Sequence, residues 1–271
     1  MAGSAVAGSD ITAKADLLEA LTAIGIAAAD AILQYRQGGA FRIKADGSPV
    51  TPADEAAEAV IRHGLERAAP AWPIVSEEQA ERVRPSVGSD YFLVDPLDGT
   101  REFIGGRDEY TVNIGLVCGS APALGIVVAP ALGLIWRGSV GRGAERLRFS
   151  SGKAGPPQAI HTRKRPDDEL IVMVSRSHLD PPTQAYVDAL PHDRRVSCGS
   201  SVKFCRLAEG MADLYPRLGP TRDWDVAAGH AVLVAAGGSI MAPDGDVLRY
   251  GTPDLRIPAF VAWGDPPPKP R

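Results

Sequence analysis

Two aspartates that lie three positions apart follow an apolar run in residues 91–100, which read YFLVDPLDGT. The apolar run predicts a strand that leads directly into Asp95, so that Asp95 and Asp98 can both face one cleft. Hard divalent cations such as Mg²⁺ prefer oxygen ligands of this kind and usually retain waters that a substrate phosphate can replace. The alternative is an aspartate-rich turn that caps a helix.

The residues between and after these aspartates favour a phosphate site. Pro96 restricts the backbone and could aim the Leu97 carbonyl as a further oxygen ligand. Gly99 would let a phosphate approach the main chain. A short helix that begins at Thr100 would present free amides to an anion.

Three other segments place carboxylates where they could join this site. Glu77 follows an apolar pair in the sequence SEE (76–78), although this segment taken alone favours a solvated loop. Asp225 opens an apolar helix and could be its N-cap or a ligand. Asp54 stands three residues after Thr51, so it could complete a capping box or polarise a hydroxyl group or a water.

Polar segments in the second half of the chain suggest anion recognition. The segments SRSH (175–178), GSSVK (199–203) and YPR (215–217) supply serine hydroxyls, one lysine and an arginine. Such groups suit a phosphate that lies away from the metal. Taken singly, each is better interpreted as a cap or a surface charge. Because the nucleophile motif GxSxG, the metal motif HExxH and the dinucleotide motif GxGxxG are absent, water is the expected nucleophile.

The pattern of apolar residues predicts the elements that hold these groups. Helices are expected over about 10–37 and from Thr51, followed by strands at 91–94, 111–117, 124–128 and 134–136 in an antiparallel sheet. Beyond about residue 150, strands alternate with helices, as in an α/β unit. We therefore predict an N-terminal α+β domain over 10–150 with most of the metal ligands, a C-terminal α/β domain over 151–264, and a disordered tail over 265–271.

Composition excludes several classes of protein. The 271 residues include 29 Lys and Arg against 33 Asp and Glu, a net charge of −4 that disfavours a general nucleic-acid binder. Three cysteines without a CxxC pair argue against a disulfide framework and fit a reduced, cytoplasmic setting. No apolar run is long enough for a membrane span, so any membrane association would be peripheral. The sequence leaves the oligomeric state open, a homodimer included.

Four motifs in this order and spacing resemble the Mg²⁺-dependent, lithium-sensitive inositol monophosphatase superfamily: SPVTPAD, SEE, DPLDGTREF and WDVAAGHAVLVAAGG. The match runs from about Lys44 to Gly238. The second half, with SRSH, GSSVKFC and LYPRLGPTRDWDVAAGH, is similar to the bacterial CysQ-type 3′(2′),5′-bisphosphate nucleotidase branch. The implied fold is a layered αβαβα sandwich. The implied reaction removes the 3′-phosphate of adenosine 3′,5′-bisphosphate to give AMP.

The resemblance also implies roles for individual residues. Two Mg²⁺ ions, with a third weaker ion near Glu77, would be held by Glu77, Asp95, the Leu97 carbonyl, Asp98 and Asp225. Asp54 and Thr100 would orient and deprotonate the attacking water, and the amides of Gly99 and Thr100 would hold the scissile phosphate. The distal 5′-phosphate would be bound by His178, Ser200, Lys203 and Arg217.

Two rival functions stay open at this point. Leu218 stands where inositol-specific relatives often carry an acidic residue, which argues against an inositol phosphate, but a broader sugar-phosphate phosphatase would share the metal site. A non-catalytic nucleotide or metal sensor could be built on the same fold. Every expected ligand is present in the sequence, which favours an enzyme.

Overall fold

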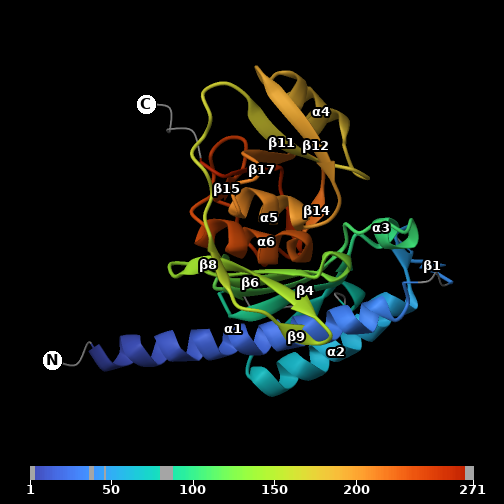
Figure 1. The fold of residues 1–271 in the computed structure, drawn as a ribbon, viewed down its shortest axis with the longest axis vertical. Helices are drawn as coiled ribbons and strands as arrows, with labels where there is room; N and C mark the ends of the chain where they lie inside the picture. The colour runs from blue at the N-terminus through green and yellow to red at the C-terminus, as the bar shows by residue number, and fades with distance from the viewer. Residues whose placement is uncertain (1–3, 37–39, 46, 80–87, 266–271) are drawn as a thin grey trace.

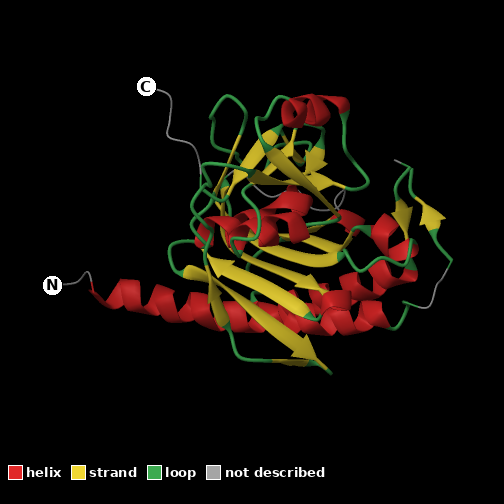
Figure 2. Cartoon of the chain, turned by 45° about the horizontal axis from the view of Figure 1, so that its top comes forward, coloured by secondary structure: helices red, strands yellow, loops and turns green. Residues whose placement is uncertain are grey.

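The computed structural model describes residues 4–36, 40–45, 47–79 and 88–265, and these form five layers. Two helices cover the outer face of a first sheet, two more helices lie between that sheet and a second one, and a single helix covers the outer face of the second sheet (Figures 1 and 2). The αβαβα sandwich expected from the sequence is confirmed.

Helices α1 (Ser4–Leu33) and α2 (Pro52–Ala68) form the first layer and pack on each other and on sheet 1. Helix α1 begins earlier than expected and extends past the edge of the sheet (Figure 1). Residues 37–39, where glycines were expected to stop it, lie outside the described residues. Helix α2 begins as predicted, with Thr51 as N-cap and Asp54 completing the capping box. None of the helices in the described ranges has the length and apolar character of a membrane span.

Sheet 1 carries the first half of the site. Its strands pair antiparallel except for β3 and β4, which are parallel. In chain order they are β3 (Ile74–Ser76), β4 (Tyr91–Asp98), β5 (Thr111–Cys118), β6 (Ala121–Ala129), β7 (Leu134–Ser139), β8 (Gly143–Ser150), β9 (Lys153–Ala154) and β10 (Gln158–Ile160).

The stretch 138–168, within which the domain boundary near residue 150 was predicted, carries three strands of sheet 1. It contains β8, β9 and β10, and β10 pairs with β8, so the chain stays in sheet 1 as far as Ile160. Strand β8 was missed because its inward residues, such as Leu147 and Phe149, alternate with arginines. The division into two domains near residue 150 stays a prediction, and residues 266–271 of the expected tail lie outside the described part of the chain.

Helices α5 (Val202–Ala208) and α6 (Asp223–Ala235) form the central layer. Helix α6 lies on a row of three glycines that face each other across neighbouring strands: Gly115 on β5, Gly125 on β6 and Gly138 on β7. A Cβ atom at Gly125 would lie 2.2 Å from the carbonyl oxygen of Ala228 on α6. The absence of side chains on this row therefore sets how closely α6 approaches the sheet.

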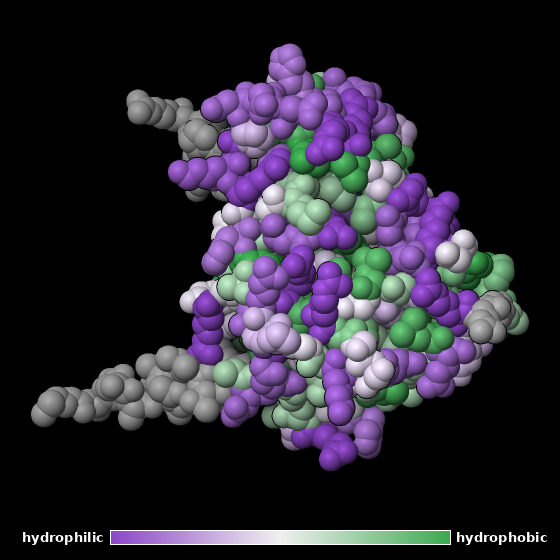
Figure 3. Space-filling model, viewed as in Figure 1, coloured by the Kyte–Doolittle hydropathy of each residue, from purple (hydrophilic) through white to green (hydrophobic). Residues whose placement is uncertain are grey.

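Sheet 2 contains parallel and antiparallel pairs. Its strands are β11 (Leu170–Ser175), β12 (Asp193–Cys198), β13 (Leu214–Arg217), β15 (Ser239–Met241) and β17 (Phe260–Trp263), in the order β12-β11-β13-β17-β15. Helix α4 (Pro181–Asp188) packs on its outer face. The alternation of strands and helices expected beyond residue 150 is confirmed by β11, α4, α5, β13 and α6. Strand β12 was not expected, because four of its six side chains are exposed at the sheet edge, in the hydrophilic end of the molecule (Figure 3).

Short elements complete the chain around the site. They are β1 (Arg42–Ile43), β2 (Pro49–Val50), the 3₁₀ helix η1 (Glu77–Gln79), α3 (Thr100–Ile104), the 3₁₀ helix η2 (Pro130–Leu132), β14 (Thr221–Arg222) and β16 (Arg256–Ile257). Most of these carry or adjoin residues that line one large cavity.

Candidate active site

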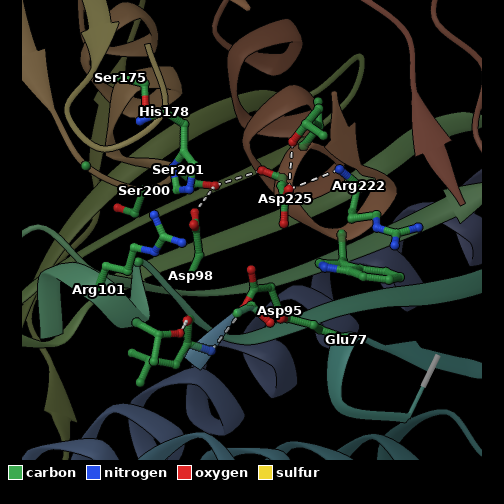
Figure 4. A pocket seen from close by; sticks show the side chains of 18 of the residues that line it. Glu77, Asp95, Asp98, Arg101, Ser175, His178, Ser200, Ser201, Arg222 and Asp225 are labelled. Carbon is green, nitrogen blue, oxygen red and sulfur yellow. Dashed lines mark hydrogen bonds between the residues drawn. The ribbon is translucent and has the colours of Figure 1, made fainter. Parts of the chain in front are cut away.

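A cavity of about 790 Å³ opens where the end of β4, the start of α3 and the first turns of α5 and α6 meet. Glu77, Asp95, Asp98 and Asp225 all line it, although they come from three different segments of the chain, η1, β4 and α6 (Figure 4). The structure therefore brings together the carboxylates that the sequence analysis singled out.

Asp95 and Asp98 reach the cavity because β4 is irregular at its end. The pairing register with β5 shifts between these two aspartates, and Pro96, which has no N–H to donate, lies inside the shift. Oδ1 of Asp95 accepts a hydrogen bond from the Leu97 amide at 3.0 Å. Asp98 follows the shift and accepts from Asn113 on the neighbouring strand at 3.2 Å. The bulge thus turns both side chains toward one space.

Glu77 and Glu78 open η1 directly after β3 and share one lysine. The Lys44 ammonium donates to Glu77 at 2.8 Å and to Glu78 at 2.6 Å. Burial by itself would lower the pKa of Lys44, but these two carboxylates outweigh burial and raise it. Lys44 is therefore charged and compensates this corner of the cavity.

Asp225 lies in the first turn of α6, at the third helical position rather than at the N-cap considered from the sequence. Its Oδ2 accepts the Thr221 hydroxyl at 2.6 Å and the Arg222 amide at 3.0 Å. A carboxylate in the first turn of a helix is stabilised by the free amides there. This arrangement fixes Asp225 at the rim of the central layer.

Mutual repulsion and burial perturb this carboxylate set. Burial raises the pKa of Asp95 well above its usual range, and the nearby charges of Glu77, Asp98 and Asp225 raise it further. Burial also raises the pKa values of Asp98, Asp225 and Glu77, and Lys44 offsets part of this effect at Glu77. The nearby positive charge therefore does not compensate these carboxylates.

Asp54 and Thr100 meet beside this cluster. The Thr100 hydroxyl lies 3.3 Å from Oδ1 of Asp54 and 3.1 Å from the Leu97 carbonyl oxygen. Oδ2 of Asp54 caps α2 by accepting the amide and the hydroxyl of Thr51. Burial raises the pKa of Asp54, and its bonds to Thr51 offset part of that shift. The two roles considered for Asp54 are therefore compatible, because each uses a different oxygen.

The basic and hydroxyl groups expected to bind an anion line the same cavity. His178 and Ser200 lie near Arg101, which the sequence analysis did not single out (Figure 4), and Arg217 also lines the cavity. Burial lowers the pKa of His178, and the charges of Arg217 and Arg101 lower it further. His178 is therefore neutral at pH 7, and the positive charge there comes from the arginines.

Lys203 also lines the cavity, but backbone carbonyl oxygens hold its ammonium. It is 4% exposed, and its ammonium donates to the carbonyl oxygens of Ser200 at 2.5 Å and Cys198 at 3.3 Å. Its nitrogen also lies 5.1 Å from the centre of the Tyr215 ring. Ser200 has a positive φ of 48°, so Lys203 helps to hold a strained turn at the cavity wall.

Comparison with known proteins agrees with this geometry. The sequence model of the inositol monophosphatase family matches residues 13–264. The chain belongs to this family. A solved member, CysQ from Bacteroides thetaiotaomicron, superposes with a TM-score of 0.78 and 31% identity over 92% of this chain and 97% of that one.

Two bacterial proteins are similar to this chain in sequence. The 3′(2′),5′-bisphosphate nucleotidase CysQ of Salmonella typhimurium is 42% identical over 240 residues, which cover 86% of this chain and 94% of that protein. CysQ of Escherichia coli K12 is 43% identical over 229 residues, covering 82% and 89%. An inositol monophosphatase from Anabaena shares the fold, with a TM-score of 0.71 and 24% identity over 92% and 90% of the two chains.

Proteins of this family and its CysQ branch are generally metal-dependent phosphatases, and the donors in this cavity fit a divalent cation by their chemistry. Glu77, Asp95, Asp98 and Asp225 supply carboxylate oxygens, and their raised pKa values show the cost of leaving such charges uncompensated. Within the described ranges, no three His, Cys, Asp or Glu side chains have the geometry of a closed metal site. The carboxylates thus line one cavity without surrounding a common point.

Sequence reasoning missed several residues that contact the segments around this cavity. Asn113 and Ser201 both bond Asp98, and Glu109 accepts the Gly199 amide while pairing with Arg176. Asn113 gave no signal, because an isolated polar residue in an apolar strand cannot be assigned a partner from sequence. Ser201 lay within the GSSVK segment but was not distinguished from its neighbour Ser200.

Proposed function

We propose that the chain is a Mg²⁺-dependent phosphomonoesterase that removes the 3′-phosphate of adenosine 3′,5′-bisphosphate, giving AMP and phosphate. The observation that carries this is a single cavity lined by the carboxylates and also by Arg101, Arg217 and His178. A ligand with two phosphates could meet both kinds of group. The relatives from Salmonella typhimurium and Escherichia coli are named 3′(2′),5′-bisphosphate nucleotidase, which supports the same substrate.

The metal site is assigned to Glu77, Asp95, the Leu97 carbonyl, Asp98 and Asp225, which would hold two or three Mg²⁺ ions. Bound divalent ions lower the pKa of a coordinated water and neutralise charge that develops on a leaving oxygen. The chain itself supplies carboxylates from β4, η1 and α6 that line one cavity.

The residues Asp54 and Thr100 are assigned to the attacking water. The Thr100 hydroxyl orients the water, and Oδ1 of Asp54 receives a proton through it. Water forms the new P–O bond as the bond between phosphorus and the 3′-oxygen breaks, and that oxygen leaves with a proton. The amides of Gly99 and Thr100, at the start of α3, are assigned to the scissile phosphate. Ser200, Lys203, Arg217 and His178 are assigned to the distal phosphate, with Lys203 acting partly through the turn that it holds.

Release of phosphate from adenosine 3′,5′-bisphosphate and from inositol 1-phosphate, measured side by side with Mg²⁺, tests this function. We expect preference for the nucleotide and inhibition by lithium. Preference for inositol 1-phosphate would be compatible with the proposed metal site. It would contradict the assignment of residues to a distal phosphate. Tight binding of the nucleotide without turnover would instead indicate a sensor.

A further inference from the structure

The hydroxyl of Ser201 lies between the two carboxylate-bearing segments of the cavity (Figure 4). Its oxygen is 2.9 Å from Oδ2 of Asp98 and 3.0 Å from the carbonyl oxygen of Asp225. Ser201 is 1% exposed, so bulk water does not compete for these contacts. One side chain therefore touches both the end of β4 and the first turn of α6.

Asn113 determines what the Ser201 hydroxyl can do. Its amide donates to the Ser201 oxygen at 2.9 Å and to Oδ2 of Asp98 at 3.2 Å, and the residue is fully buried on β5. Because Ser201 accepts from Asn113, its single hydrogen is directed to Asp98 or to Asp225. Asn113 and, at 3.5 Å, the Thr111 hydroxyl donate to Oδ2 of Asp98, and the Ser201 hydroxyl lies in position to donate to the same oxygen. In the described part of the chain, Oδ1 of Asp98 accepts no side-chain hydrogen bond.

The position of Ser201 in its helix supports a role at the site. Ser201 is the N-cap of α5, where a serine hydroxyl commonly accepts an amide of the first turn. No such side-chain cap forms here. The hydroxyl is used for Asp98 and Asp225 in place of its usual capping role.

We propose that Ser201 is a positioning residue, which holds Asp98 against the first turn of α6 and so fixes the separation of the Asp98 and Asp225 carboxylates for a divalent cation. This inference rests on the proposed metal-dependent function. It adds a residue that orients the ligands, and groups of this kind commonly change metal affinity 10–100-fold when they are lost.

Titration calorimetry with Mg²⁺ and no substrate, on protein stripped with EDTA, tests the proposal. Ser201→Ala should raise the apparent Kd for Mg²⁺ by about tenfold. Ser201→Cys keeps nearly the same side-chain volume and retains a weak donor, so its Kd should lie between those of the wild type and Ser201→Ala. Ser239→Ala is the matched control, because the Ser239 hydroxyl is buried without a partner in the described residues. It should leave the Kd unchanged.

Activity provides the second measurement. The Mg²⁺ concentration for half-maximal activity should rise in Ser201→Ala by a similar factor, with a smaller change in kcat at saturating Mg²⁺. A lowered Tm with an unchanged Kd would show that Ser201 is only structural and would overturn the proposal. Wild-type protein that binds Mg²⁺ but cleaves neither substrate would remove the proposed function, while the Kd values of the variants would still decide the role of Ser201. Wild-type protein that does not bind Mg²⁺ would overturn both.

Discussion

The Thr100 hydroxyl lies 3.3 Å from Oδ1 of Asp54, while Oδ2 of the same carboxylate caps helix α2. The helix that positions Asp54 is thus stabilised by the group proposed to receive the proton. The cap restricts rotation of the carboxylate and leaves one oxygen for chemistry. Asp54→Asn should lower kcat by about 10²- to 10⁴-fold, the usual contribution of a general base, with little change in KM.

Steady-state kinetics and circular dichroism together check this prediction. Glu66→Gln, on the exposed side of α2, is the control and should retain wild-type kcat. A folded Asp54→Asn variant with nearly unchanged kcat would exclude Asp54 as the base.

Asp95 has opposite effects on activity and on stability. Asp95→Asn should nearly abolish turnover, because Asp95 is the ligand proposed to bridge two ions. The same change should stabilise the EDTA-treated protein at neutral pH, since it removes a buried charge that Glu77, Asp98 and Asp225 repel. Phosphate release and thermal unfolding in EDTA measure the two effects. Retained activity would show that the metal assignment is wrong.

The stability of EDTA-treated protein should fall as the pH rises. The folded-state pKa values of Asp95, Asp98 and Asp225 lie above the unfolded value of 3.8, so the folded state binds more protons. Their contribution is complete below about pH 4 and is lost as the pH rises through the raised values. Mg²⁺ should reverse this loss, because it compensates the ionised carboxylates. Denaturant unfolding between pH 5 and 8, with and without Mg²⁺, gives the comparison, and equal curves would contradict the prediction.

His230 should produce the opposite pH dependence. Its side chain is buried against the Tyr250 hydroxyl at 2.9 Å, and burial lowers its pKa to about 4 from 6.5. The stabilisation is complete above pH 6.5 and is lost as the pH falls toward 4, by about 3 kcal/mol. His230→Asn, which cannot titrate, should flatten the free energy of unfolding over this range, whereas Tyr250→Phe should keep the slope. An unchanged slope in His230→Asn would assign the acid sensitivity elsewhere.

Arg217 should distinguish a bisphosphate from a simple monoester. Arg217→Ala should raise KM for adenosine 3′,5′-bisphosphate by about tenfold or more and leave KM for p-nitrophenyl phosphate nearly unchanged. Lys203→Ala should act in the same direction and also lower Tm, because the Lys203 ammonium holds the carbonyl of Ser200. Arg249→Ala is the control, because the Arg249 side chain donates to the Ser120 hydroxyl. Equal effects on both substrates would remove Arg217 from the distal site.

The motifs that combine a turn with a carboxylate could be predicted from sequence, because the residues that define them are neighbours in the chain. Thr51, Pro52 and Asp54 specify a helix start by themselves, and the aspartates of β4 follow an apolar run. Contacts across the layers were not readable in this way. The partners of Ser201 come from β4, β5 and α6, which only the fold brings together.

Edge and arginine-rich strands were the other failures of the sequence analysis. Strand β8 has a weak apolar pattern because its apolar residues alternate with arginines, and β12 has one because four of its six side chains are exposed. Their pairing depends on neighbours already placed in a sheet, and a single window of sequence contains no information about those neighbours.

The row formed by Gly115, Gly125 and Gly138 affects the site although it lies outside the cavity. Helix α6 lies directly on this row, so a methyl group at Gly125 would force the helix away from the sheet. Asp225 would move with it, because it belongs to the first turn of the same helix. Inactivating mutations can therefore arise at positions that do not line the cavity, and a screen that ranks positions by their distance from the substrate would overlook them.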